Sequence, residues 1–364
     1  MPEIRNRNIG IATDMFGCPN RCRHCYIGKS PNGQMTEDDL RWALDKFRSF
    51  MRLGEDKPFF DTIDVVTWRR EPDFSDDYRR LYELEVELSD VKTYRAEWEL
   101  MSVWRLTHDE SYAPWARSIG IKTCQTTFFG LGETQDWFYR RKGAFQDCIT
   151  ATERLLDAGI KPRWQIFFTK KIIPEFDELM RLVDQMKLRE KCAELGGEFV
   201  MFTHTPGWEG EGVFLEDLTP TIDDVGAIPS ELIEATLRHN KSLVNWKTVG
   251  ERVREILDCD QVEYPYASSF QDPMLWFIVK PNGDVYTNRA EDPWWKLGNL
   301  HSDSMDTIIQ TFEQNKTLAL HTIYNVPLRE LAKRYGDPDS RLLDGDVEDL
   351  WLAKYCAEIY RAEK

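Results

Sequence analysis

The alternation of strand and helix signals is the feature of this sequence that most restricts its fold. Six short apolar runs predict strands, and segments with helical patterns separate these runs. One such helix is predicted after Thr36, where acidic residues in the first turn precede apolar residues at helical spacing. When each strand is followed by a helix, neighbouring strands lie parallel to one another and are joined by right-handed crossovers. Residues 1–210 are therefore predicted to form an α/β barrel or an open α/β sheet. The predicted strands are residues 9–15, 62–68, 91–97, 121–129, 164–169 and 199–203.

The pattern changes in the last third of the chain. Residues 211–260 are predicted to be a connecting segment, partly helical and partly irregular. Two short apolar runs then flank Asn282-Gly283, which predicts a β-hairpin. Residues 261–364 are therefore predicted to form a smaller α+β module, with helices at 304–314, 326–335 and 346–361.

Charge and composition exclude several classes of partner. The net charge of the 364 residues is -16, whereas a nucleic-acid binder needs a basic face, so we expect no nucleic-acid partner. No apolar run approaches the roughly 20 residues of a membrane span, and the first residues lack the apolar core of a signal peptide. We therefore expect a cytoplasmic protein without a membrane partner.

Three of the eight cysteines lie close together, in a loop directly after the first predicted strand. Cys18, Cys22 and Cys25 have the spacing CxxxCxxC, and barrel chemistry takes place at the C-terminal ends of strands. Three thiolates can hold a [4Fe–4S] cluster and leave one iron free to bind a cofactor. The alternative is a structural zinc site completed by His24 or a distant histidine, although no second CxxC pair is present.

CxxxCxxC after a first strand resembles the radical S-adenosylmethionine (SAM) superfamily. The resemblance implies a partial (β/α)6 barrel of the radical SAM type, with a [4Fe–4S] cluster and SAM as cofactors. In this family the reduced cluster cleaves SAM to a 5′-deoxyadenosyl radical, which abstracts hydrogen from the substrate. The resemblance also implies an external electron donor such as flavodoxin or ferredoxin.

Other segments resemble the family's cofactor-binding positions in the expected order. Glu71, in the segment WRREP, corresponds to the acid that binds the ammonium group of SAM, although arginines replace the two usual glycines. Gln125 and Thr127 share one face of the fourth strand and are candidate contacts to the ribose or the substrate. Arg163, which alternates onto one face with Gln165, is a candidate partner of the cofactor carboxylate. Tyr26, after the third cysteine, is also expected at the cofactor.

Candidate substrate contacts lie where predicted strands end. They are Glu97 and Glu99 after the third strand, and His204 and Trp208 after the sixth. Cys124 is expected on the face of the fourth strand opposite Thr127, and hence away from the barrel lumen.

The C-terminal module resembles SPASM and twitch extensions through its hairpin and the segment Leu297-Gly298-Asn299-Leu300. Those extensions normally bind auxiliary clusters through many cysteines. Here Asn288 stands near an expected cysteine, and the region offers only Cys259 and Cys356, too few for an ordinary cluster. Without an internal electron acceptor, we expect rearrangement, elimination, decarboxylation or epimerisation rather than net oxidation.

Three functions remain open from the sequence. The first is a radical SAM enzyme acting on a small polar metabolite or natural-product intermediate. The second is modification of a peptide, which the SPASM-like tail favours; because the cysteines begin at residue 18, we expect no N-terminal peptide-recognition domain. The third is a non-catalytic protein with a structural zinc.

Overall fold

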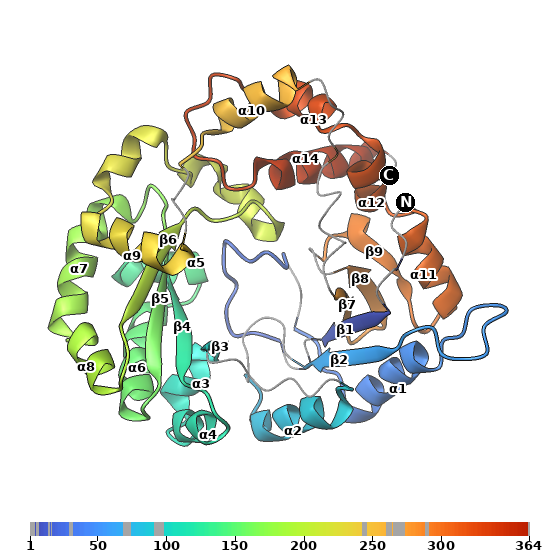
Figure 1. The fold of residues 1–364 in the computed structure, drawn as a ribbon, viewed down its shortest axis with the longest axis horizontal. Helices are drawn as coiled ribbons and strands as arrows, with labels where there is room; N and C mark the ends of the chain where they lie inside the picture. The colour runs from blue at the N-terminus through green and yellow to red at the C-terminus, as the bar shows by residue number, and fades with distance from the viewer. Residues whose placement is uncertain are drawn as a thin grey trace.

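The structure is a computed structural model of the chain. It describes residues 4, 7–13, 15, 17–28, 32–67, 74–90, 98–241, 246–259, 264, 274–287 and 291–362. The strands line the inside of an open ring and the helices cover its outside (Figure 1).

One half of the ring is a parallel sheet with the strand order β3-β4-β5-β6. Alternate residues of β4 are buried, so one face packs against the surrounding helices and the other faces the centre of the ring. This matches the sequential βα units expected from the sequence. The strands are β3 (Trp98–Leu100), β4 (Thr123–Phe128), β5 (Lys161–Phe167) and β6 (Val200–His204).

The other half is a five-stranded sheet with the order β2-β1-β7-β8-β9. Strand β1 pairs in parallel with β2 on one edge and with β7 on the other, so both of its edges are satisfied. The strands are β1 (Asn8–Thr13), β2 (Thr62–Val66), β7 (Leu275–Val279), β8 (Asp284–Thr287) and β9 (Lys296–Asn299).

The pairing of β1 with β7 joins the two ends of the chain. Gly10 stands opposite Trp276 in the register, and a Cβ atom on Gly10 would overlap the indole ring. The predicted hairpin is therefore present as β7 and β8, but its strands extend the sheet of β1 instead of forming a sheet of their own. The boundary predicted at residue 260 stays a prediction.

The two sheets are not paired with each other in the described residues. A complete run of six barrel strands would pair β2 with β3, but the strand predicted at residues 91–97 lies outside the described residues. Strand β3 begins at Trp98, directly after it.

In the part of the chain that the structure describes, three apolar cores hold the ring together. The first lies between the β3–β6 sheet and the helices α3 (Val103–His108), α4 (Tyr112–Ser118), α5 (Gly132–Tyr139), α6 (Ala144–Asp157), α7 (Phe176–Gln185), α8 (Leu188–Glu194) and α9 (Ser230–Asn240). The second lies between the five-stranded sheet and the helices α1 (Glu37–Arg48), α2 (Tyr78–Leu88), α11 (Met305–Glu313) and α12 (Leu318–Asn325).

The third core closes the ring between β6 and β7 (Figure 1). It joins α10 (Val249–Asp258), α13 (Leu328–Tyr335) and α14 (Val347–Ala362). Four 3-10 helices complete the described elements: η1 (Ile173–Glu175), η2 (Gly210–Leu218), η3 (Ile222–Ala227) and η4 (Pro293–Trp295). Within the described part of the chain, no helix is both long and apolar enough to cross a membrane.

Candidate functional site

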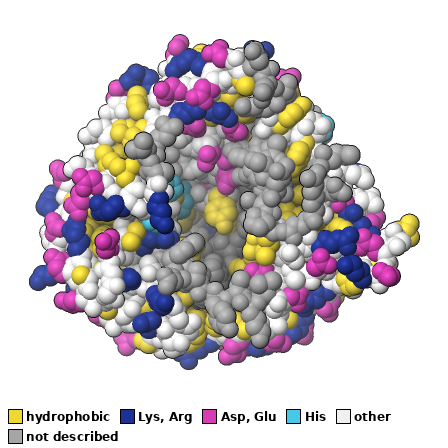
Figure 2. Space-filling view, in the orientation of Figure 1, with side chains coloured by type: hydrophobic (Ala, Val, Ile, Leu, Met, Phe, Trp, Pro, Cys, Tyr) yellow, Lys and Arg dark blue, Asp and Glu magenta, His cyan; other side chains and the backbone are white. Residues whose placement is uncertain are grey.

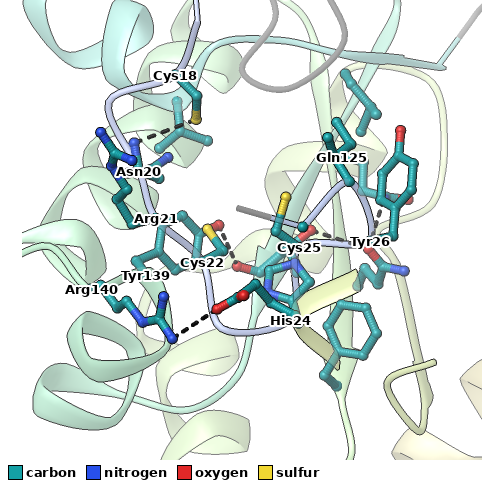
Figure 3. A pocket seen from close by; sticks show the side chains of 18 of the residues that line it. Cys18, Asn20, Arg21, Cys22, His24, Cys25, Tyr26, Gln125, Tyr139 and Arg140 are labelled. Carbon is teal, nitrogen blue, oxygen red and sulfur yellow. Dashed lines mark hydrogen bonds and ion pairs between the residues drawn. The ribbon is translucent and has the colours of Figure 1, made fainter. Parts of the chain in front are cut away.

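The loop after β1 borders a cavity of about 380 Å³ inside the ring. Cys18, Cys22 and Cys25 all line it, and Figure 3 shows their sulfur atoms on the inner side of the arc that the loop describes. Strands β4 and β5 supply the opposite wall. Figure 2 shows the hollow at the centre of the ring, with cationic and histidine side chains at its rim.

The loop is fixed to the C-terminal end of α5 by backbone hydrogen bonds. The amide of Arg21 donates to the carbonyl of Tyr139 at 3.2 Å, and the amide of Arg23 donates to the carbonyl of Phe138 at 2.8 Å. The last carbonyls of a helix have no partner within the helix, so α5 offers them to the loop. The Arg23 side chain adds a bond from Nε to the Trp137 carbonyl at 3.0 Å.

The far end of the loop is held by residues that follow β6. The amide of Glu211 donates to the Cys25 carbonyl at 2.9 Å. Gly210 has a φ of +54°, and a Cβ atom there would overlap the backbone carbonyls of Cys25 and Tyr26. Only glycine gives both this conformation and this close approach without strain. The loop geometry therefore depends on Gly210, although it lies 185 residues beyond Cys25.

His24 lines the cavity, and its ring packs beside two stacked aromatic side chains. Its centroid lies 4.1 Å from that of Phe129 and 5.3 Å from that of Phe167. Burial, and secondarily the nearby ring of His204, lowers the pKa of His24 to about 3. Its Nδ1 atom is enclosed and has no hydrogen-bond partner among the described residues. A ligand in the cavity could satisfy that atom.

A chain of polar side chains crosses the inner face of β4, β5 and β6. The Arg163 guanidinium donates to Gln125 Oε1 at 2.6 Å, and Gln125 Nε2 donates to Gln165 Oε1 at 2.8 Å. Gln165 Oε1 also accepts from the Thr127 hydroxyl at 3.1 Å, so Gln165 Nε2 is left to donate to His204 Nε2 at 2.7 Å. Because Arg163 can only donate, it fixes the orientation of both amides.

The last member of the chain is a neutral histidine. His204 Nε2 accepts from Gln165, and its Nδ1–H donates to the carbonyl of Thr205 at 2.8 Å. Burial lowers the pKa of His204 below its usual value, which agrees with a ring that carries one proton. Burial also lowers the pKa of Arg163.

The structure brings most of the predicted cofactor positions to one place. Tyr26, Gln125 and Thr127 line the cavity with the three cysteines; Tyr26 is 45% exposed. Arg163 and His204 lie behind the lining and bond to residues that form it. Cys124 is buried in the first core, on the face of β4 opposite Thr127.

Other predicted positions are not at the cavity or cannot be placed. Trp208 is only 1% exposed and packs in the third core, so its position gives no support to a substrate contact. Its aromatic ring fills space between helices, which is the commonest role of a buried tryptophan. Glu71 and Glu97 lie outside the described residues, as does Asn288. Glu99 lies in β3, but the structure describes only its backbone and not its side chain.

Among the residues of the cavity wall that were not expected there are Gln165, Arg140 and Glu211. Gln165 lies at the centre of the polar chain, and its alternation with Arg163 along β5 was the available signal. Arg140 and Glu211 form an ion pair of 3.0 Å at the wall, with the Glu211 side chain only 6% exposed. The two are 71 positions apart in the sequence, and no local pattern connects them.

The residues present fit a cluster with an attached cofactor. Three thiols border one cavity, its volume lies in the range of ligand sites, and an enclosed ring nitrogen of His24 has no partner among the described residues. In the described ranges, no three histidine, cysteine or acidic side chains form a group that could hold one metal ion.

No protein-family model matches the sequence, and no curated protein matches it. Solved structures do resemble the fold. The structure of anSMEcpe with bound AdoMet (SAM) covers 98% of this chain and 100% of its own, with a TM-score of 0.52 at 14% identity. The structure of anSMEcpe with AdoMet and the Kp18Cys peptide covers 98% of both chains, with a TM-score of 0.51 at 14% identity. anSMEcpe is a radical SAM enzyme.

This chain has the radical SAM fold. The expected partial (β/α)6 barrel is confirmed as the fold class. A looser likeness relates the chain to coproporphyrinogen III oxidase (HemN) from Escherichia coli, which is also a radical SAM enzyme; the TM-score is 0.42 at 12% identity, over 99% of this chain and 91% of that one. Whether the C-terminal part of this radical SAM fold is SPASM-like stays a prediction.

Proposed function

We propose that the protein is a radical SAM enzyme whose cysteine loop holds a [4Fe–4S] cluster. The observation that carries the proposal is the convergence of Cys18, Cys22 and Cys25 on one cavity inside a barrel of this fold. Three cysteines leave one iron of the cluster for SAM, and AdoMet is bound in the similar structure of anSMEcpe.

The bound cluster would supply one electron that cleaves SAM to methionine and a 5′-deoxyadenosyl radical, and the radical would take a hydrogen atom from the substrate, leaving 5′-deoxyadenosine and a substrate radical. The chain itself binds and orients. Gln125 and Thr127 face the cavity from β4, where their polar groups can contact the ribose or the substrate. Arg163 holds the Gln125 amide in one orientation.

Other residues would shape the site and exclude water from it. His24 lines the cavity and packs its ring against Phe129 and Phe167, which would keep water from that side. Glu71 and Glu97 keep their proposed roles at the SAM ammonium and the substrate, respectively, and Glu99 and His204 are proposed near the substrate. An external donor such as flavodoxin or ferredoxin would reduce the cluster.

The experiment is an anaerobic assay for 5′-deoxyadenosine. The protein is reconstituted with iron and sulfide, and SAM and dithionite are added. Wild type and Cys259→Ala, a cysteine far from the loop in sequence, should both be brown and form 5′-deoxyadenosine. Cys22→Ala should bind little iron and form none. A colourless wild type that contains zinc and forms no product would support the structural-zinc alternative instead.

The favoured substrate is a small polar metabolite or natural-product intermediate, because amide and hydroxyl groups of Gln125, Thr127 and Gln165 converge on the cavity. Peptide modification is the second candidate, because anSMEcpe binds the Kp18Cys peptide and its fold covers 98% of this chain. Fractionating an extract by size distinguishes them: the fraction that raises 5′-deoxyadenosine formation contains either small molecules or peptides.

A further inference from the structure

Five cationic side chains lie on the cysteine loop and around the C-terminal end of α5, although the chain as a whole has a net charge of -16. This cationic patch consists of Arg21, Arg23, Arg140, Lys142 and Lys171. All are exposed except Arg23, which is half-buried. The patch is therefore a local reversal of the charge of the protein.

Trp137 of α5 brings two members of the patch together. The Arg23 guanidinium lies 4.0 Å from the centroid of a Trp137 ring, and the Lys171 ammonium lies 4.6 Å from it. Cations favour such positions on an indole. The Arg23 amide also donates to the carbonyl of Phe138 at 2.8 Å, which places Arg23 beside the end of α5, two residues before Arg140.

Of the nearby acids that the structure describes, only Glu211 pairs with a member of the patch, and the others bond to groups outside it. Glu211 pairs with Arg140 at 3.0 Å, and Asp147 pairs with Arg141 at 2.5 Å. Asp136 accepts hydrogen bonds from two backbone amides of the turn after α5, at 2.7 and 2.9 Å. Among the described residues, the side chains of Arg21 and Lys142 form no ion pair.

The patch lies directly against the proposed cluster ligands. Arg21 and Arg23 flank Cys22 in the sequence, and Arg21 and Arg140 also line the cavity. Arg141, next to Lys142, donates to the Asn20 side chain of the same loop at 2.6 Å. A protein bound on the patch would therefore contact the loop that carries the thiolates.

We propose that the cationic patch docks an acidic carrier protein that delivers one electron to the cluster. This inference rests on the proposed function. The reduced carrier loses one electron and the oxidised cluster gains it, and no bond or proton is transferred. An acidic carrier is repelled by most of a chain of charge -16, so attraction at the patch both speeds the encounter and selects the orientation in which the carrier meets the loop.

The test compares two electron sources in two variants. Lys142→Glu/Lys171→Glu reverses two charges of the patch and touches no residue of the cavity lining. Lys57→Glu/Lys333→Glu reverses two exposed lysines elsewhere and is the matched control. The rate of 5′-deoxyadenosine formation is measured with dithionite and with reduced flavodoxin, an acidic carrier, at low and high salt.

With dithionite, wild type and both variants should react at equal rates. With limiting flavodoxin, the patch variant should be slower by about tenfold or more, the control should change by less than about twofold, and added salt should slow wild type. Titration of the oxidised protein with flavodoxin should show weaker binding by the patch variant only.

Two results would overturn the inference. One is equal rates and equal flavodoxin binding for the patch variant and the control. The other is a patch variant that slows equally with dithionite and with flavodoxin, which would assign the cations to an acidic peptide or another substrate. Failure of the proposed function gives a different result: the wild type then forms no 5′-deoxyadenosine even with dithionite. In that case this inference is also wrong, because it rests on that function.

Discussion

The side-chain amide of Gln165 donates from Nε2 to Nε2 of His204 across 2.7 Å, and this bond sets the protonation of the histidine. An amide nitrogen cannot accept, so the ring nitrogen that faces it must be free of a proton. The second ring nitrogen carries the proton and donates to the Thr205 carbonyl. Arg163, at the other end of the chain of amides, fixes this arrangement through Gln125.

The substitution Gln165→Glu should therefore raise the pKa of His204. A carboxylate still accepts from Gln125 and Thr127, but it favours a proton on the facing nitrogen and stabilises the charged ring. The measurement is a titration of the His204 ring by NMR in the protein without cofactors. Gln146→Glu, an exposed change on α6, should leave the titration unchanged. An unchanged His204 pKa in Gln165→Glu would show that the bond does not control the ring.

The substitution Gly10→Ala should weaken the fold by about 1–3 kcal/mol, because the new methyl group overlaps the Trp276 indole at the pairing of β1 with β7. Urea unfolding gives the change. Gly226→Ala is the control, since a Cβ atom there has no neighbour within 4 Å. Equal stabilities of the two variants would contradict the observed register.

The substitution Gly210→Ala should reduce iron binding while most of the fold remains. Its φ of +54° costs an alanine about 1–2 kcal/mol, and the added Cβ also pushes on the carbonyls of Cys25 and Tyr26. Gly54→Ala is a matched control, because Gly54 has a φ of +88° and nothing within 4 Å of its Cβ position. Iron content after reconstitution should fall in Gly210→Ala alone. A full cluster in that variant would show that the loop does not depend on this contact.

Asp292 should make stability depend on pH. Burial, and then the charges of Glu211 and Glu291, raises its pKa to about 6 from an ordinary 3.8. Between these values the folded state binds more protons than the unfolded state, so this group lowers stability as pH rises through the window. Above pH 6 the whole cost of the buried charge is present.

Asp292→Asn should therefore be more stable than wild type by about 1–3 kcal/mol at pH 8, and the gain should shrink as pH falls toward 4. Unfolding in urea at several pH values measures it. The exposed substitution Asp56→Asn should have no effect at any of them. A gain that is constant with pH would mean that Asp292 does not titrate in this range.

The elements of the barrel could be predicted because their signals are local. An acidic turn after Thr36 and apolar residues at helical spacing become α1, and the alternating side chains of β4 separate Gln125 and Thr127 from Cys124 in the structure as in the pattern. The cysteine spacing is equally local, and all three residues border the cavity.

Contacts between distant segments could not be predicted in this way. The pairing of Gly10 with Trp276 joins strands 266 positions apart, and the support of Cys25 by Gly210 depends on how β6 ends. Trp208 illustrates the same limit: it follows the sixth strand as expected, but helices from the end of the chain enclose it. The sequence near each residue does not encode these neighbours.

The central claim is that Cys18, Cys22 and Cys25 hold a cluster with one iron available to SAM. The most direct measurement is the electron paramagnetic resonance spectrum of the reconstituted, reduced protein with and without SAM. The claim predicts a cluster signal that changes when SAM binds, and no such signal in Cys22→Ala. An iron-replete protein whose signal is unaffected by SAM, or a protein that holds zinc and gives no cluster signal, would contradict it.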